Sequence, residues 1–350
     1  MVTEQANVTL TKTEKKELLV FLLVTFGIPL LMTIPLALTY EAGKDTSAFA
    51  YAQMFYPAAG FMLAKLICEK DKRLLPKMFG GFLLLTIVMI IWCFVGFFVS
   101  NKTIMSGCFL LLAAGSFLIA LLLLIEKDET RDAYKLNGAN WNRSFGILIL
   151  FVVLLFSRDF IQRTAFGAEL FGSISSQTIT SFLQFPMFFI FSFAAFLGEE
   201  YGWRCYFQPL LQQKFGLIKG VLMFGVLWGL WHFQLDLFYY PSMDLFDFLG
   251  TIPMIHTVLI RQVTCISLGI FFAYAYIKTN NLWLPILLHF FNNSLVAIMM
   301  SNQALCHPAF TWTTVGLFAL GNFTLFAPFL CSKVFRKQVT TPDGDTQIEH

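Results

Sequence analysis

Charged residues are scarce in this sequence. Asp, Glu, Lys and Arg make up 13% of the 350 residues, whereas hydrophobic residues make up 57% and the mean hydropathy is +0.70. Globular proteins contain about 25% charged and about 45–50% apolar residues. The imbalance argues against a soluble two-domain fold and against a disordered or fibrous chain. It favours a polytopic membrane protein, because a bilayer core of about 30 Å requires apolar runs of about 20 residues.

Signals for several other protein classes are also missing. The net charge of +3 is too small to indicate nucleic acid, so we expect no nucleic-acid partner. The seven cysteines include no CxxC pair and therefore indicate neither a disulfide framework nor a zinc knuckle. The sequence contains no internal repeat with a period of 20–50 residues.

Apolar runs of spanning length recur along the chain and predict an all-α, polytopic transmembrane bundle of about ten spans. The first run is too long for a signal peptide and has no small-residue cleavage site at its end, so we expect an uncleaved span. The fifth run is short and closes with Ser157, Arg158 and Asp159. The runs cover residues 18–40, 49–68, 78–100, 105–125, 145–160, 180–208, 218–238, 254–277, 282–300 and 310–331.

Basic residues alternate between the two sides of this arrangement. If the N-terminus is cytoplasmic, the inside segments hold 18 of the 24 Lys and Arg residues. Cytoplasmic segments of membrane proteins carry such an excess. We therefore expect both termini to be cytoplasmic.

Three polar clusters interrupt the apolar runs of the second half, and polar groups at membrane depth indicate function by default. In the first, Glu200 and Arg204 are four residues apart and can pair on one helix face, which leaves Glu199 unpaired. A partly desolvated, unpaired carboxylate suits a general base. The alternative is that both glutamates are ordinary charges at the cytoplasmic helix end.

The second cluster contains Trp228 and His232, and the third contains His289 and Asn293 on one side of a helix. The alternatives here are a packing histidine and an interhelical hydrogen bond. At about 1.5 Å per residue, Glu199, His232, His289 and Asn293 lie roughly 20, 21, 12 and 18 Å from the cytoplasmic face. The overlapping depths favour one buried polar site over three unrelated features.

These residues resemble the motifs of the CPBP intramembrane protease family, which contains CAAX proteases and bacteriocin-processing enzymes. Glu199-Glu200-x-x-x-Arg204 resembles its EExxxR motif, and His289-x-x-x-Asn293 resembles HxxxN/D. Trp228-x-x-x-His232 resembles FxxxH, with Trp at the aromatic position. The resemblance covers roughly residues 180–300.

The resemblance implies a protease with a catalytic cavity inside the bilayer. Glu199 would activate a water, His232 would orient it, and His289 and Asn293 would stabilise the developing oxyanion. Glu200 and Arg204 would support Glu199, while Trp228 would provide an aromatic wall.

A cofactor is not expected, although a metal site remains an alternative. Glu199, His232 and His289 have the composition of a His₂Glu zinc site. The resemblance favours a metal-free glutamate mechanism, because zinc bound by Glu199 would require a different base.

The expected function is an intramembrane endopeptidase that acts on a peptide or a membrane-anchored protein. The alternative is a non-proteolytic membrane partner, such as a bacteriocin self-immunity or regulatory protein; a transporter would need matched broken helices in two halves. We expect a multi-pass protein of a bacterial cell membrane, in contact with the lipid bilayer. The expected organisation is N-terminal helices of unknown role (1–176), a catalytic core (177–305), and a last helix with a cytoplasmic tail (306–350).

Overall fold

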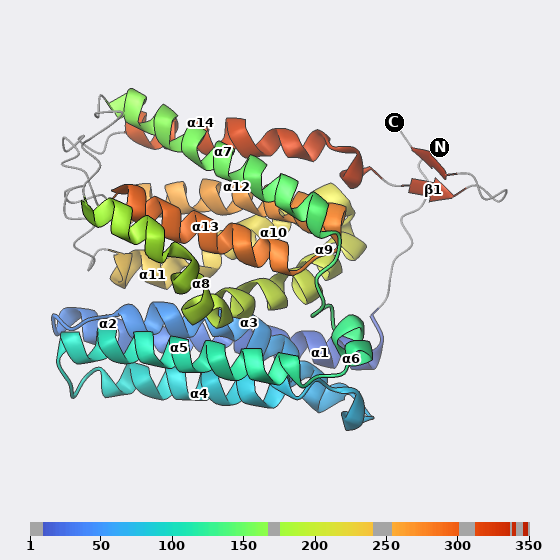
Figure 1. Cartoon of the computed structure of the whole chain (residues 1–350), viewed down its shortest axis with the longest axis horizontal. Helices are drawn as coiled ribbons and strands as arrows, with labels where there is room; N and C mark the ends of the chain where they lie inside the picture. Colours follow the sequence, from blue (N-terminus) through green and yellow to red (C-terminus); the bar gives the residue numbers. More distant parts are fainter. Residues whose placement is uncertain are drawn as a thin grey trace.

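The computed structural model describes residues 10–166, 176–240, 254–300, 312–336, 338–340 and 346–348, and its bundle is helical (Figure 1). Every predicted apolar run corresponds to a helix or to a continuous series of helical segments. They are α1–η1–α2 (Lys12–Leu22, Leu23–Gly27 and Ile28–Glu41), α3 (Ser47–Cys68), α4 (Met78–Val95), α5 (Asn101–Leu124), α7 (Trp141–Phe166), α8–η3–α9 (Ser176–Gly202, Trp203–Phe207 and Gln208–Phe215), α10–α11 (Leu217–Trp231 and Phe233–Phe238), α12 (Met254–Thr279), α13 (Trp283–Met300) and α14–η6 (Trp312–Phe326 and Ala327–Cys331).

The remaining elements are short and lie between or after these segments. They are η2 (Lys72–Leu74), α6 (Asp128–Ala133), η7 (Lys333–Phe335), and the antiparallel strands β1 (Gln338–Thr340) and β2 (Thr346–Ile348). In Figure 1 the strand pair stands outside the helical bundle.

Seven helical segments of the described chain are long and apolar enough to cross a membrane. They are Lys12–Glu41, Met78–Val95, Asn101–Leu124, Trp141–Ile161, Ile179–Phe215, Leu217–Phe238 and Thr257–Thr279. The predicted all-α polytopic bundle is therefore confirmed, and the protein is an integral, multi-pass membrane protein. The count of ten spans and the cytoplasmic position of the termini stay predictions.

The helices form two outer groups with α8 between them. In Figure 1, α1 to α5 lie on one side, and α7, α12, α13 and α14 lie on the other. Helix α8 packs against α3 and α5 of the first group and against α13 of the second. The helix with the adjacent glutamates therefore joins the two groups.

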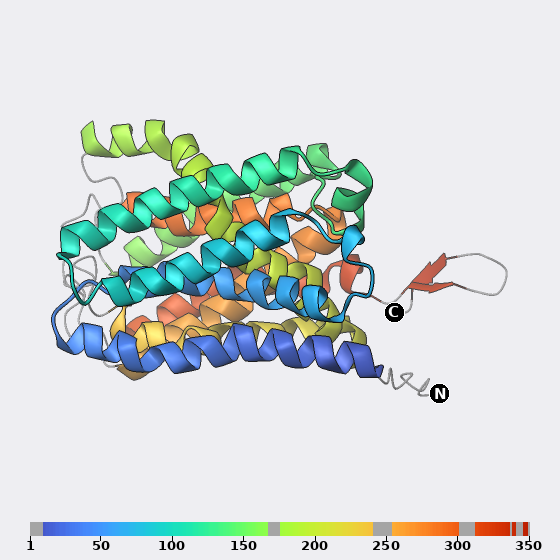
Figure 2. The same ribbon diagram turned by 90° about the horizontal axis from the view of Figure 1, so that it is seen from below.

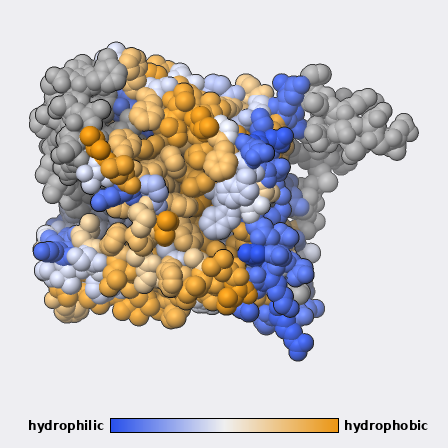
Figure 3. Space-filling model, viewed as in Figure 1, coloured by the Kyte–Doolittle hydropathy of each residue, from blue (hydrophilic) through white to orange (hydrophobic). Residues whose placement is uncertain are grey.

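The surface has an apolar belt and a polar rim. Side chains such as Leu30, Leu31 and Leu183 are more than 70% exposed, which suits contact with lipid. Figure 3 shows the apolar belt ending at a hydrophilic band on one end of the bundle. Helix α1 begins and η7 ends at that same end (Figures 1 and 2). The two ends of the helical chain thus lie on one side of the belt.

Two glycines allow α8 to approach α3 at backbone distance. A Cβ atom on Gly202 would lie 2.2 Å from the carbonyl carbon and oxygen of Pro57, and one on Gly198 would lie 2.6 Å from the Met54 oxygen. Small residues four apart commonly mark such close crossings of membrane helices. Since these glycines flank Glu199 and Glu200, the crossing fixes the position of both carboxylates.

The fifth predicted run differs from its helix in length. Helix α7 continues to Phe166, well past the expected end at residue 160. Arg158, which closes the predicted run, is 7% exposed. Its polar partners on α13 and α14 compensate for the buried charge.

Candidate active site

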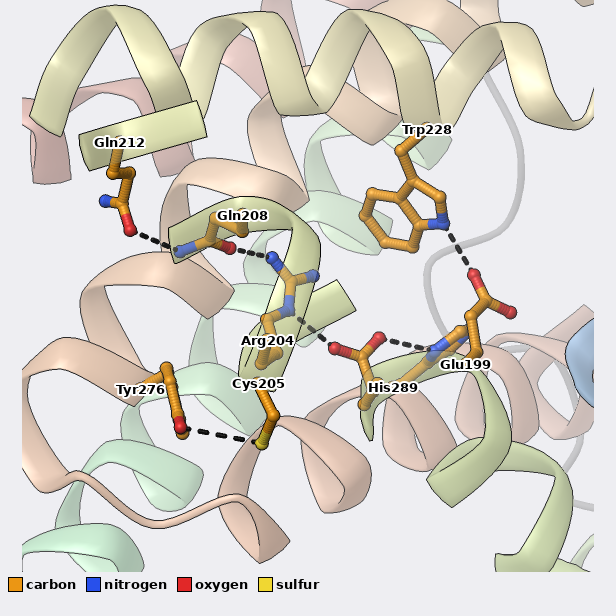
Figure 4. A network of polar contacts seen from close by, with 9 residues as sticks. Glu199, Arg204, Cys205, Gln208, Gln212, Trp228, Tyr276 and His289 are labelled. Atoms are coloured by element: carbon orange, nitrogen blue, oxygen red, sulfur yellow. Dashed lines mark hydrogen bonds and ion pairs between the residues drawn. The ribbon is translucent and has the colours of Figure 1, made fainter. Parts of the chain in front are cut away.

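The adjacent glutamates of α8 are both fully buried, at 1% and 0% exposure. Glu200 forms the ion pair with Arg204 that the i,i+4 spacing predicts: Nε of Arg204 lies 2.7 Å from Oε2 of Glu200 (Figure 4). Arg204 lies in η3, a π-helical turn that follows Gly202 directly. Such single-turn π segments occur frequently at functional sites.

The second oxygen of Glu200 contacts α13. Nδ1 of His289 lies 2.9 Å from Oε1 of Glu200, and because an ionised carboxylate only accepts, Nδ1 donates this hydrogen bond. Rings of Phe196, Trp228 and Phe272 lie 5.3, 5.9 and 6.2 Å from the His289 ring. Glu200 thus joins the first and third motifs inside an aromatic enclosure.

Glu199 has a different partner. The indole Nε1 of Trp228 donates a hydrogen bond of 2.5 Å to Oε1 of Glu199 (Figure 4). Trp228 was expected only to provide an aromatic wall, so the structure adds a function that phenylalanine could not perform. A buried tryptophan N–H normally needs a partner, and this requirement was the available signal in the sequence.

His232 follows the last residue of α10 and is half-buried. Its Nδ1 lies 2.8 Å from the backbone oxygen of Trp228, so Nδ1 carries the hydrogen and Nε2 is left as the acceptor. The thiol of Cys265 is 4.0 Å from the same nitrogen. The helix end therefore sets the orientation of this ring.

The guanidinium of Arg204 is enclosed by three aromatic rings. Its Cζ lies 4.6 Å from the ring centroid of Phe224, 5.4 Å from that of Phe272 and 5.5 Å from that of Trp228. A cation over such ring faces gains electrostatic attraction. The charge of Arg204 is therefore held in place by one carboxylate and by an aromatic cage.

A line of amides continues from Arg204 along the same helix face. Nη1 of Arg204 donates to Oε1 of Gln208 at 2.5 Å, and Nε2 of Gln208 donates to Oε1 of Gln212 at 3.3 Å (Figure 4). Neither glutamine was among the predicted site residues. The successive i,i+4 steps from Arg204 to Gln208 and from Gln208 to Gln212 were the signal that could have identified them.

Asn293 lies one turn beyond His289 on α13 and is exposed. Its Oδ1 accepts a hydrogen bond of 3.0 Å from Nδ2 of Asn292. Side-chain hydrogen bonds thus form two adjacent sets. One joins Glu199 and Trp228, and the other joins Glu200 with Arg204 and His289. His232 is connected through the Trp228 backbone, and Asn293 belongs to a separate amide pair.

The N-terminal helices hold the end of α10, although their sequence suggested no role. Nε2 of Gln53 in α3 donates to the Trp231 oxygen at 2.7 Å, and Nε1 of Trp231 donates to the Thr25 oxygen at 2.7 Å. Gln234 donates to Oε1 of Gln53 at 2.6 Å. These contacts position the residues on either side of His232.

The three candidate zinc ligands face different partners. Glu199 accepts from Trp228, His289 donates to Glu200, and His232 donates to a backbone oxygen. In the described part of the chain, no group of three or more His, Cys, Asp or Glu side chains is placed to hold a metal ion. These contacts occupy Nδ1 of both histidines and one oxygen of Glu199 and leave both Nε2 atoms, so a zinc site stays an alternative that a chelator can test.

Comparisons with known proteins match a protein family to the segment that contains these residues. Residues 181–295 match a family model described as Type II CAAX prenyl endopeptidase Rce1-like. A CAAX prenyl protease 2 of Methanococcus maripaludis is 28% identical over 176 residues, which cover 46% of this chain and 62% of the relative. The chain thus spans less than two thirds of the length of this relative. No solved structure matches the chain. All three motifs lie inside the matched segment, so residues 181–295 are similar to the Rce1-like CAAX prenyl endopeptidase family.

Proposed function

We propose that the protein is an intramembrane endopeptidase that hydrolyses a peptide bond with a water activated by Glu199. The observation that carries this proposal is the difference between the two buried carboxylates. Glu200 engages Arg204 and His289 with its two oxygens, whereas Glu199 accepts a hydrogen bond from the indole of Trp228, lies near the indole of Trp203, and has no ion-pair partner within the described residues. Glu199 is therefore the carboxylate with remaining capacity to accept a proton from water.

In this mechanism each residue has a defined role. Glu199 removes a proton from water, and the resulting hydroxide attacks the carbonyl carbon of the scissile bond. His289 and Asn293 donate hydrogen bonds to the developing oxyanion, while His232 orients the water. As the carbon–nitrogen bond breaks, Glu199 returns the proton to the leaving amine. Preorganised oxyanion donors contribute about 3–4 kcal/mol to such a reaction.

The arrangement around His289 adds a requirement to this mechanism. Nδ1 already donates to Glu200 at 2.9 Å, so a donor to the oxyanion must come from Nε2. The ring then carries hydrogens on both nitrogens. Glu200 would orient His289 in addition to holding Arg204.

The substrate class follows from the relative. That relative is named a CAAX prenyl protease. We extend this class to the present chain: the substrate would be a membrane-anchored protein with a lipidated C-terminal segment. The belt of exposed apolar side chains supports this proposal, because it offers a surface on which such an anchor can lie. The bacterial cell membrane expected from the resemblance stays a prediction.

The test compares purified wild type with Glu199→Ala on lipidated and unlipidated peptides. We expect product from wild type and none from Glu199→Ala, while Glu129→Ala, at an exposed site of α6, retains activity. Equal cleavage by wild type and Glu199→Ala would refute the mechanism. No cleavage by wild type, with biological activity retained in Glu199→Ala, would indicate a non-proteolytic partner. A chelator tests the zinc alternative, and unchanged activity would remove it.

A further inference from the structure

Arg158 is a buried cation outside the three motifs. It lies in α7, within the candidate span Trp141–Ile161, and is 7% exposed. Its Nη1 contacts two amide oxygens at 3.3 Å each: Oδ1 of Asn292 in α13 and Oδ1 of Asn322 in α14. Charges inside a membrane bundle are costly and are retained where they perform a function. The proposed catalytic steps do not yet include Arg158.

The guanidinium fixes the orientation of both amides. Arginine has only donors, so each asparagine must present its oxygen to it. The Nδ2 group of Asn322 then donates to the Phe318 backbone oxygen at 3.0 Å. The Nδ2 group of Asn292 points instead to Oδ1 of Asn293, at 3.0 Å.

The direction of these hydrogen bonds determines which group of the Asn293 side chain stays free to form another hydrogen bond. Because Oδ1 of Asn293 is occupied by Asn292, its Nδ2 group is the free end, and no acceptor is bonded to it within the described residues. Asn293 is also exposed, unlike Asn322 and Arg158. An oxyanion requires a donor, and a reversed amide would present a repelling oxygen.

We propose that Arg158 and Asn292 are positioning residues that hold the Asn293 amide with its N–H donor toward the reaction. This inference rests on the proposed function, in which Asn293 stabilises the oxyanion. The inference adds two residues to the proposed mechanism. They are Arg158 of α7 and Asn292, which lies between the motif positions His289 and Asn293. Neither residue touches the substrate; both act through Asn293.

Asn292→Asp is the most specific variant. The new carboxylate keeps an oxygen for Arg158 and gains an ion pair, so the bundle remains folded. It also places an oxygen opposite Asn293, whose amide must turn to donate to it. Losing one oxyanion donor lowers kcat by about 10²–10³-fold, and we expect a fall of about 100-fold with KM unchanged within about twofold.

The experiment measures kcat, KM and Tm of the full-length protein with a lipidated peptide. The variants are Asn292→Asp, Arg158→Met, Asn293→Ala and the double Asn292→Asp/Asn293→Ala. The control is Ser157→Ala, whose hydroxyl bonds only within α7, to the Val153 oxygen. We expect Arg158→Met to lower kcat by about tenfold, and the double variant to match Asn293→Ala.

Three results would overturn the inference. The first is that Asn292→Asp keeps the kcat of wild type. The second is that the fall in kcat of Asn292→Asp/Asn293→Ala equals the product of the two single falls. The third is that Arg158→Met lowers Tm but not kcat. If wild type cleaves nothing, the proposed function fails, and a stability cycle then judges the hydrogen-bond chain separately. If the hydrogen-bond chain exists, the double variant Arg158→Met/Asn292→Leu loses less Tm than the sum of the two single variants. A loss equal to that sum refutes the hydrogen-bond chain.

Discussion

The close crossing of α8 and α3 makes Gly202→Ala the sharpest test of the fold around the carboxylates. The added methyl group would lie 2.2 Å from the carbonyl carbon and oxygen of Pro57 and 2.7 Å from the nitrogen of Ala58. All three atoms belong to the backbone, so no side-chain rotation can relieve the contact. Ordinary van der Waals contact begins near 3.4 Å, and the helices must therefore separate by about 1.2 Å.

Two opposing effects determine the size of the loss. Overpacking of a filled interior costs about 1–3 kcal/mol and sometimes more, and a backbone clash lies at the upper end. Alanine is a better helix former than glycine by about 1 kcal/mol, which offsets part of that cost. We expect a net loss of about 2 kcal/mol or more. Glu199 moves with the helix, and a displacement of about 1 Å reduces a well-oriented reaction about 100-fold.

The measurement compares the thermal unfolding and peptide cleavage of Gly202→Ala with those of Gly146→Ala. Gly146 also lies within a helix, but a Cβ atom there would meet nothing within 4 Å. Gly146→Ala should therefore be as stable as wild type or slightly more stable, and fully active. The reasoning is wrong if Gly202→Ala unfolds at the same temperature as Gly146→Ala and keeps its activity.

The remaining predictions concern polar contacts of the site. Trp228→Phe keeps the aromatic wall but leaves the buried Glu199 without its indole donor, so unfolding scans should show a loss of about 1–3 kcal/mol. Glu200→Ala and Arg204→Ala each strand a buried charge at a cost of about 3–5 kcal/mol, and the double variant should lose less than their sum; an additive result would contradict the pair. Gln53→Leu leaves a buried carbonyl oxygen at the end of α10 unpaired and should cost about 1–3 kcal/mol, with KM and kcat both altered because the segment at His232 shifts.

The fold was largely predictable because bilayer thickness and helical rise together set the length of each apolar run. The described helices follow those runs, including the hairpin at Gly216, whose φ of +86° turns the chain between α9 and α10. The sequence did not predict the burial of Arg158, which closes the fifth apolar run and contacts α13 and α14. Hydropathy alone cannot distinguish a charge at the membrane boundary from one satisfied by neighbouring helices.

The candidate site was predictable only where spacing along one helix decides the contact. The Glu200–Arg204 pair follows from such spacing and is present. The contacts of Glu200 with His289 and of Glu199 with Trp228 join residues 89 and 29 positions apart, and no local pattern specifies them. The catalytic roles assigned to Glu199, His232, His289 and Asn293 stay predictions until the variants are measured.

The glycine contact between α8 and α3 has a consequence for dissecting the molecule. The segment recognised by the family model, residues 181–295, contains one half of a helix crossing whose other half lies on α3. Expressed alone, that segment would present Gly198 and Gly202 to lipid and leave Trp231 without two of its hydrogen-bond partners. Co-expression of two fragments, divided between α5 and α7, should instead restore the assembly, since each fragment carries a surface that only the other one completes.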